Sequence, residues 1–147
     1  MPDSKPIIMV VDDEEEFVEA LSERLEVRGL TVFKAFSGQQ ALEVLDKHRN
    51  TDVVILDVKM PGMDGIDTLR EIKSRFPLIE VLMLTGHATV DTAIQGMKLG
   101  AYDYLMKPCE IDILMAKVQE AVKRKRDQER RIREAQVREA ITDYGLE

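Results

Sequence analysis

The sequence predicts an α/β protein in which helices cover both faces of a five-stranded parallel sheet. Short apolar runs alternate five times with stretches whose apolar residues recur every three or four positions, the spacing of one helical face. The short runs are almost continuously apolar, which is typical of strands buried on both faces. Five such units joined by right-handed crossovers make a doubly wound (βα)5 sandwich. This is the predicted fold class.

The five predicted strands are runs of apolar, β-branched and aromatic residues. The third, VVIL, contains only buried-type side chains and ends at Asp57 before a Pro-Gly turn. In order, the predicted strands are residues 7–11, 31–35, 53–56, 81–84 and 102–106.

Each predicted strand is followed by a predicted helix, and local signals mark several helix ends. Ser37 is a suitable N-cap, Gly29 and Gly100 are suitable C-terminal residues, and Pro77 cannot continue a helix. The five helices rest on these apolar sets: Phe17, Ala20, Leu21 and Leu25; Ala41, Leu42 and Leu45; Ile66, Leu69, Ile72 and Phe76; Val90, Ala93, Ile94 and Met97; Ile111, Leu114, Met115, Val118 and Val122.

The chain is expected to consist of one folded domain, residues 1–124, and a charged C-terminal extension or linker, residues 125–147. The extension is rich in helix formers, but only Ile132, Val137 and Ile141 stand out as apolar. That stripe is too sparse for a heptad seam. We expect a charged helix, with disorder as the alternative.

Composition and charge restrict the classes of function. Residues 1–115 carry a net charge of −9 and residues 116–147 a net charge of +2, so the body does not suit non-specific nucleic-acid binding. No apolar run approaches the roughly 20 residues needed to span a membrane, and no secretory signal is visible at the start. The single cysteine, Cys109, allows no internal disulfide. We therefore expect a cytoplasmic protein.

Polar residues gather where the predicted strands end. Asp12 and Asp13 follow the first strand, Asp57 the third and Thr85 the fourth, while the fifth leads into Lys107. In an open parallel sheet, functional residues lie just beyond the carboxyl ends of the strands. These five side chains are therefore expected to converge on one edge.

This set of residues suits phosphoryl transfer assisted by magnesium. Three neighbouring carboxylates repel one another, and a divalent cation relieves that repulsion. Oxygen ligands favour Mg²⁺, and without histidine or cysteine in the cluster zinc is not expected. With Asp12 and Asp13 on the metal, Asp57 can attack phosphorus as a carboxylate nucleophile. Lys107 would neutralise the phosphoryl group and Thr85 would hydrogen-bond to it.

Four motifs resemble one known family, the receiver domains of bacterial two-component response regulators. They are VVDDEEEF (10–17), VVILDVKMPGMDG (53–65), VLMLTGHA (81–88) and GAYDYLMKP (100–108). All four occur in the order and spacing of that family, and the resemblance covers roughly residues 5–124. It agrees with a flavodoxin-like sheet of strand order 2-1-3-4-5.

The resemblance implies roles for the acidic residues. Asp57 corresponds to the phosphoacceptor, and Asp12 and Asp13 to the acidic pair that holds Mg²⁺ together with Asp57. The family's metal also takes a backbone carbonyl two residues beyond the acceptor, which here belongs to Lys59.

The resemblance also implies a switch. Thr85 and Lys107 correspond to the family's switch threonine and lysine, and Tyr104 to its aromatic switch residue. The Lys107–Pro108 peptide is expected to be cis. The surface of the fourth helix, fifth strand and fifth helix would carry the change to a downstream protein, and a homodimer is possible.

The predicted function is a phosphorylation-activated signalling switch rather than an enzyme. A histidine kinase or phosphotransfer protein would supply the phosphoryl group, and no direct contact with nucleic acid or membrane is expected. A receiver portion of a larger transcriptional activator is the alternative. A Mg²⁺-dependent phosphohydrolase is less favoured because such enzymes tend to carry an acid where Lys59 stands. A flavin-binding module is less favoured because the acidic loop after the first strand would repel a phosphate.

Overall fold

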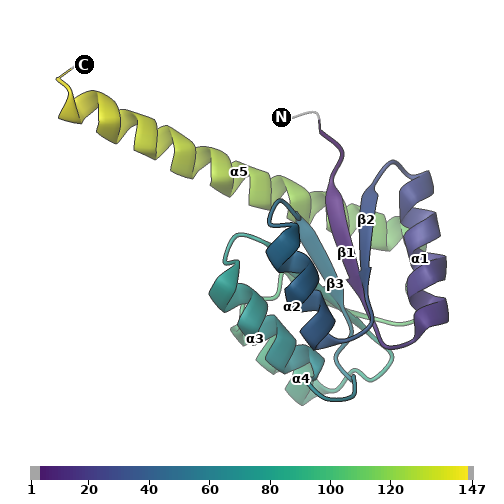
Figure 1. Ribbon diagram of the computed structural model, residues 1–147. Coiled ribbons are helices and arrows are strands. Elements are labelled where there is room, and N and C mark those ends of the chain that lie inside the picture. The colour runs from purple at the N-terminus through teal and green to yellow at the C-terminus, as the bar shows by residue number, and fades with distance from the viewer. Residues whose placement is uncertain (1–3, 146–147) are drawn as a thin grey trace.

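The computed structural model describes residues 4–145 and contains a five-stranded parallel sheet (Figure 1). The strand order is β2-β1-β3-β4-β5, so the predicted fold class and strand order are confirmed. The strands are β1 (Ile7–Val11), β2 (Thr31–Ala35), β3 (Val53–Leu56), β4 (Glu80–Thr85) and β5 (Asp103–Met106).

Side chains alternate along each strand and supply two separate cores. In β1, Met9 and Val11 pack into one core while Ile8 and Val10 pack into the other. All four are at most 1% exposed. Because both faces of the strand are buried, its sequence is continuously apolar instead of alternating with polar residues.

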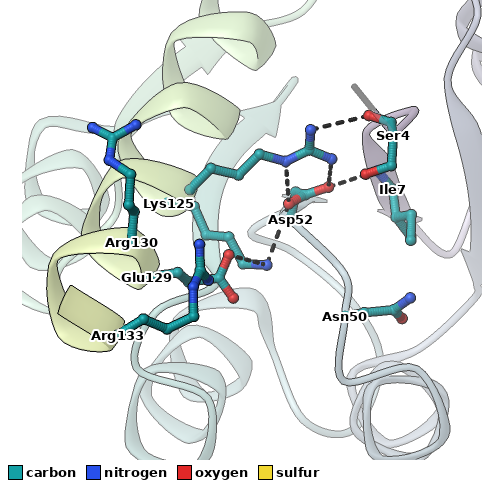
Figure 2. A pocket seen from close by; sticks show the side chains of 9 residues that line it. Ser4, Ile7, Asn50, Asp52, Lys125, Glu129, Arg130 and Arg133 are labelled. Carbon is teal, nitrogen blue, oxygen red and sulfur yellow. Dashed lines mark hydrogen bonds and ion pairs between the residues drawn. The ribbon is translucent and has the colours of Figure 1, made fainter. Parts of the chain in front are cut away.

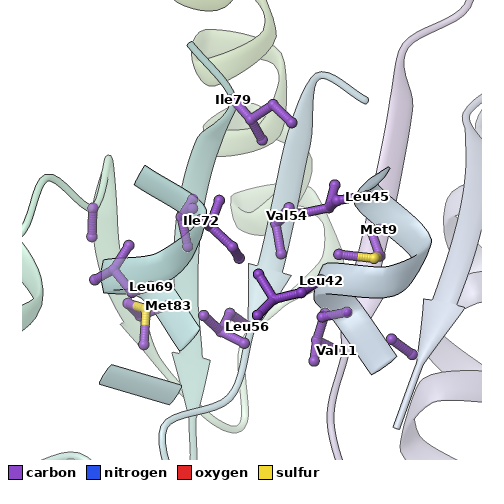
Figure 3. Packing of buried hydrophobic residues seen from close by; sticks show 14 of the residues in the cluster. Met9, Val11, Leu42, Leu45, Val54, Leu56, Leu69, Ile72, Ile79 and Met83 are labelled. Carbon is purple, nitrogen blue, oxygen red and sulfur yellow. The ribbon is translucent and has the colours of Figure 1, made fainter. Parts of the chain in front are cut away.

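The helices divide between the two faces of the sheet. They are α1 (Glu15–Val27), α2 (Gly38–Lys47), α3 (Gly65–Arg75), α4 (Val90–Lys98) and α5 (Ile111–Asp143). One core joins the sheet to α2 and α3, and Figure 3 shows Leu42, Leu45, Leu69 and Ile72 packed over its strands. The other core joins the sheet to α1 and α5.

Side-chain caps begin three of the helices. The Ser37 hydroxyl accepts a hydrogen bond from the Gln40 N–H at 3.1 Å, as the sequence predicts. Asp64 caps α3, and Thr89 forms a capping box with Thr92 at the start of α4. At the start of α1 the N-cap is Glu14, without a side-chain cap. Three helix starts are thus stabilised locally.

The fourth helix lies where the sequence predicts it, but its buried face is different. Val90, Ile94 and Met97, which carry the apolar periodicity, are 76%, 48% and 47% exposed. The buried residue of α4 is Gly96. A side chain there would come within 3.5 Å of the Tyr104 ring. That distance is an ordinary van der Waals contact, so the Gly96 face of α4 lies beside Tyr104 of β5.

The fifth helix continues without a break past residue 124. It runs over 33 residues, and its C-terminal half projects away from the sheet (Figure 1). Its last buried residue is Lys125, and beyond that the apolar Ile132, Val137 and Ile141 are exposed. The described part of the extension is therefore helical to Asp143. The division of the chain at residue 124 remains a prediction. Between residues 4 and 145, no helix combines the length and the apolarity needed to cross a membrane.

Candidate functional site

The strand register brings the acidic residues of β1 and β3 together. Val11 pairs with Leu56, so Asp12 and Asp57 are the next residues on two adjacent strands. The Asp57 N–H donates to the Val11 carbonyl at 3.0 Å. One carboxylate oxygen each from Asp12, Asp13 and Asp57 lies within 4.8 Å of the others. The three aspartates form a single cluster, which we call the acidic cluster.

The members of the acidic cluster differ in burial. Asp12 is 1% exposed and Asp57 is 3% exposed, whereas Asp13 faces solvent. Asp12 Oδ1 accepts a hydrogen bond from the Glu14 N–H at 2.9 Å. The cluster therefore has a buried floor and one solvent-facing carboxylate. Asp13 does not cap α1, whose N-cap is Glu14.

Burial raises the pKa of the Asp57 carboxyl above its ordinary value, and the neighbouring Asp12 charge adds to the rise. The Thr85 hydroxyl, the Lys107 ammonium and the Val58 N–H oppose it without cancelling it. The Val58 N–H donates to Asp57 Oδ1 at 2.8 Å. With three carboxylates and one lysine, the site holds more negative charge than its own cation compensates.

Lys107 is the cation of this edge. Its Nζ lies 2.6 Å from Asp12 Oδ2 and 3.9 Å from Glu14 Oε1. The same Nζ lies 3.9 Å from the centre of the Phe17 ring, a cation–π contact. The peptide bond between Lys107 and Pro108 is cis. Phe17 was assigned to the helical core by its spacing, and its sequence position alone contains no signal for the contact with the lysine.

Thr85 and Tyr104 lie on the adjacent strands β4 and β5. Thr85 is fully buried, and its hydroxyl oxygen accepts a hydrogen bond from the His87 N–H at 3.0 Å. Tyr104 is half-buried, and its hydroxyl lies 2.7 Å from Thr92 Oγ1 on α4. The tyrosine is thus tied to α4 in this structure. Thr92 is a partner that the sequence reasoning missed.

The loop after Asp57 folds back tightly onto the end of β3. The Gly65 N–H donates to the Val58 carbonyl at 2.6 Å, and a Cβ on Gly65 would lie 2.0 Å from the Asp57 carbonyl oxygen. Close approach therefore requires glycine at 65, whereas Gly62 is required by its φ of 74°. Lys59 lies in this loop, and its carbonyl as a metal ligand remains a prediction.

The donor set of the acidic cluster fits a hard divalent cation. Its three ligand groups are carboxylates, and Mg²⁺ prefers oxygen. Three carboxylates beside one lysine leave negative charge that a bound cation would compensate. Lys107 already contacts Asp12. The cluster and its chemistry are therefore compatible with magnesium.

Comparison with known proteins agrees with this geometry. The sequence matches the response regulator receiver domain over residues 8–119. It is 44% identical over 115 residues to the transcriptional regulatory protein ZraR of Escherichia coli O157:H7, covering 78% of this chain and 26% of that protein. It is 37% identical over 123 residues to the DNA-binding transcriptional regulator NtrC of Escherichia coli strain K12, covering 84% of this chain and 26% of that protein.

A solved structure agrees as well. The crystal structure of a response regulator receiver domain protein from Clostridium thermocellum superposes with a TM-score of 0.79 at 40% identity, covering 82% of this chain and 97% of that one. The chain spans about a quarter of the length of the curated relatives it matches. The chain belongs to the response regulator receiver domains, the phosphorylation switches of two-component signalling.

Proposed function

We propose that Asp57 is the phosphoacceptor of this receiver domain. A carboxylate oxygen of Asp57 attacks the phosphorus of the donor, a bond forms between them, and the bond from phosphorus to the donor's leaving atom breaks with its electron pair leaving on the donor. The observation that carries the proposal is the acidic cluster itself. A buried Asp57 lies beside Asp12 and Asp13, with Lys107 on the same edge of the sheet.

The neighbouring side chains of this chain prepare Asp57 for attack. Only the deprotonated carboxylate is nucleophilic, and burial works against that form. Thr85, Lys107 and the Val58 N–H all favour the charged form. We propose that Lys107 and Thr85 then hold the transferred group by charge and by hydrogen bonding.

Asp12, Asp13, Asp57 and the Lys59 carbonyl are the residues proposed to hold Mg²⁺. When bound, the cation neutralises the oxygens of the incoming phosphoryl group. Asp12 and Asp13 supply the two carboxylates that are not consumed by the transfer. Their role is to position charge, because neither is proposed to form a bond to phosphorus.

Thr85 and Tyr104 are proposed as the switch residues. A phosphoryl group on Asp57 adds charge and hydrogen-bond acceptors that would draw the buried Thr85 hydroxyl toward it. Tyr104 would then leave its contact with Thr92, 2.7 Å away, and turn inward. The face of α4, β5 and α5, which exposes Val90, Ile94 and Met106, would present the change to a downstream protein.

The partners are proposed from the family. A histidine kinase or phosphotransfer protein in the cytoplasm supplies the phosphoryl group, and the chain turns over no other substrate. Because the matched region makes up only 26% of the curated relatives, which are named as transcriptional regulators, we propose that this domain controls such a regulator. Contact with DNA would then belong to another part of that protein, and a homodimer is compatible with the exposed helix faces.

Intact-mass measurement with a small phosphodonor tests the proposal. The protein is incubated with acetyl phosphate with and without Mg²⁺, beside Asp57→Asn and a control, Asp67→Asn. Asp67 is an exposed carboxylate on α3 that pairs with Arg70. One phosphoryl group should be added to the unaltered protein and to the control, only with Mg²⁺. A full adduct on Asp57→Asn, or none on the unaltered protein, would contradict the assignment.

A further inference from the structure

The opposite edge of the sheet also contains a buried carboxylate, Asp52. It is 2% exposed and lies directly before β3. Its N–H donates to the Ile7 carbonyl at 2.8 Å, and its own carbonyl accepts from the Glu80 N–H at 3.1 Å. Its side-chain Oδ2 accepts from the Ile7 N–H at 2.8 Å. Asp52 is thus held by β1 and β4 on either side.

Two consecutive cations of α5 bind this carboxylate. Figure 2 shows Lys125 beside Asp52. Lys125 Nζ lies 3.2 Å from Asp52 Oδ1, and Lys125 is itself 4% exposed. Arg126 donates from Nε to Oδ1 at 3.2 Å and from Nη2 to Oδ2 at 3.1 Å. This two-point contact fixes the guanidinium plane as well as its position. Arg126 also donates to the Ser4 carbonyl at 3.0 Å.

The preceding residue of α5 is held by a second strand end. Arg124 Nε lies 2.9 Å from Oε2 of Glu80, which is 3% exposed. The N–H is not directed at that oxygen, which has no hydrogen-bond partner, so the contact is an ion pair only. Lys73 lies 3.5 Å from Oε1 of the same residue. Three consecutive residues, 124 to 126, therefore face carboxylates from the start of β3 and β4.

These contacts occur where α5 leaves the core. The buried residues of α5 end at Lys125, and apolar packing therefore cannot orient the helix beyond that point. In proteins most helical stability comes from tertiary packing, and residues 130–143 are mostly exposed. Lys125 also lies 3.2 Å from Glu129, one turn further along. The same lysine thus connects the sheet to the first turn of the projecting helix.

We propose that Asp52, Lys125 and Arg126 form a clamp that fixes the direction of α5 as it leaves the receiver core. The clamp makes residues 127–143 a rigid arm, so that a domain or partner attached beyond it is held in a set orientation. The anchor is the peptide backbone of β1 and β4, which hold Asp52. The clamp lies at the opposite edge of the sheet from Asp57 and does not rest on the proposed phosphorylation.

Distance measurement between two spin labels tests the clamp. In a Cys109→Ser background, Glu43→Cys places one label on exposed α2 and Arg138→Cys places the other on the arm. With the clamp intact we expect one narrow distance distribution. In Asp52→Asn and in Arg126→Gln we expect a broad distribution, and amide exchange in residues 127–143 faster by about tenfold or more.

The control is Asp127→Asn. It removes exposed ion pairs with Lys123 and Arg130 on the same helix but does not touch Asp52, and should keep the narrow distribution. Arg126→Gln leaves Asp52 paired with Lys125. This variant therefore tests the clamp by itself if Asp52→Asn does not fold. A narrow, unshifted distribution with unchanged exchange in Arg126→Gln would overturn the proposal, and the apolar face of α5 would then set its direction.

Discussion

Two carboxylates are buried where the strands end, which we call the carboxyl edge, and two where they begin, the amino edge. The two pairs differ in the positive charges around them. Asp12 and Asp57 at the carboxyl edge are as buried as Asp52 and Glu80 at the amino edge, since all four are at most 3% exposed. At the amino edge each carboxylate faces two cations from other elements. At the carboxyl edge, Lys107 is the one lysine that contacts the acidic cluster within residues 4–145.

Burial of an acid does not by itself mark a functional site. A buried carboxylate is costly unless charge and hydrogen bonds compensate it. At the amino edge, cations compensate the charges of Asp52 and Glu80. These two carboxylates therefore stabilise the fold. The carboxyl edge has three carboxylates and one lysine, and therefore an excess of negative charge that an added cation would compensate. Burial, together with the Asp12 charge, raises the pKa of Asp57 there. The imbalance of charge distinguishes the two edges.

The largest expected effect is at the amino edge. Asp52→Ala leaves the buried Lys125 without its strand partner, and removing one member of a buried pair costs about 3–5 kcal/mol of unfolding free energy. Urea unfolding followed by circular dichroism measures the loss. A loss below about 1 kcal/mol would show that the ion pairs of Asp52 do not stabilise the amino edge in the way proposed.

The carboxyl edge should respond with the opposite sign. Without Mg²⁺, Asp57→Asn should raise the unfolding free energy at pH 7 by on the order of 1 kcal/mol, because it removes a poorly compensated buried charge.

The pH dependence follows from the raised pKa. The folded protein retains the Asp57 proton to higher pH than the unfolded chain does, so the unaltered protein loses stability as pH rises through the folded-state pKa. The advantage of Asp57→Asn should therefore shrink as pH falls toward the ordinary carboxyl pKa. Urea unfolding over a pH series in a chelating buffer measures this. Destabilisation by Asp57→Asn at pH 7 would refute the charge argument.

The smallest effect is expected at an exposed pair that belongs to neither edge. Arg70 Nη1 lies 2.9 Å from Asp67 Oδ1 on α3, and both side chains are 56% exposed. Arg70→Ala should change the unfolding free energy by no more than about 0.5 kcal/mol, because solvent already compensates both charges. The same urea experiment serves as the baseline for the two larger effects. A loss of several kcal/mol here would mean that the contribution of an ion pair to stability depends on the distance between its charges and not on their burial.

The order of elements and the membership of the acidic cluster follow from the amino-acid sequence alone. The spacing of apolar residues, nearly continuous in the strands and every three or four positions in the helices, is a local property of the chain. It therefore predicts the elements without knowledge of the fold. The sequence also predicts that Asp12, Asp13 and Asp57 lie close together, because parallel strands have their carboxyl ends at one edge of the sheet. The structure places these three side chains within 4.8 Å.

Contacts between side chains that are far apart in the sequence depend on the packing of the whole fold. Asp52 and Lys125 are 73 positions apart, and no local pattern links them. The apolar period of α4 predicted a helix but not that Val90 and Ile94 face solvent, because the face of α4 that packs beside Tyr104 of β5 is the one that carries Gly96. Local periodicity specifies a helix or strand from its own residues, whereas ion pairs and packed faces depend on where the other elements dock.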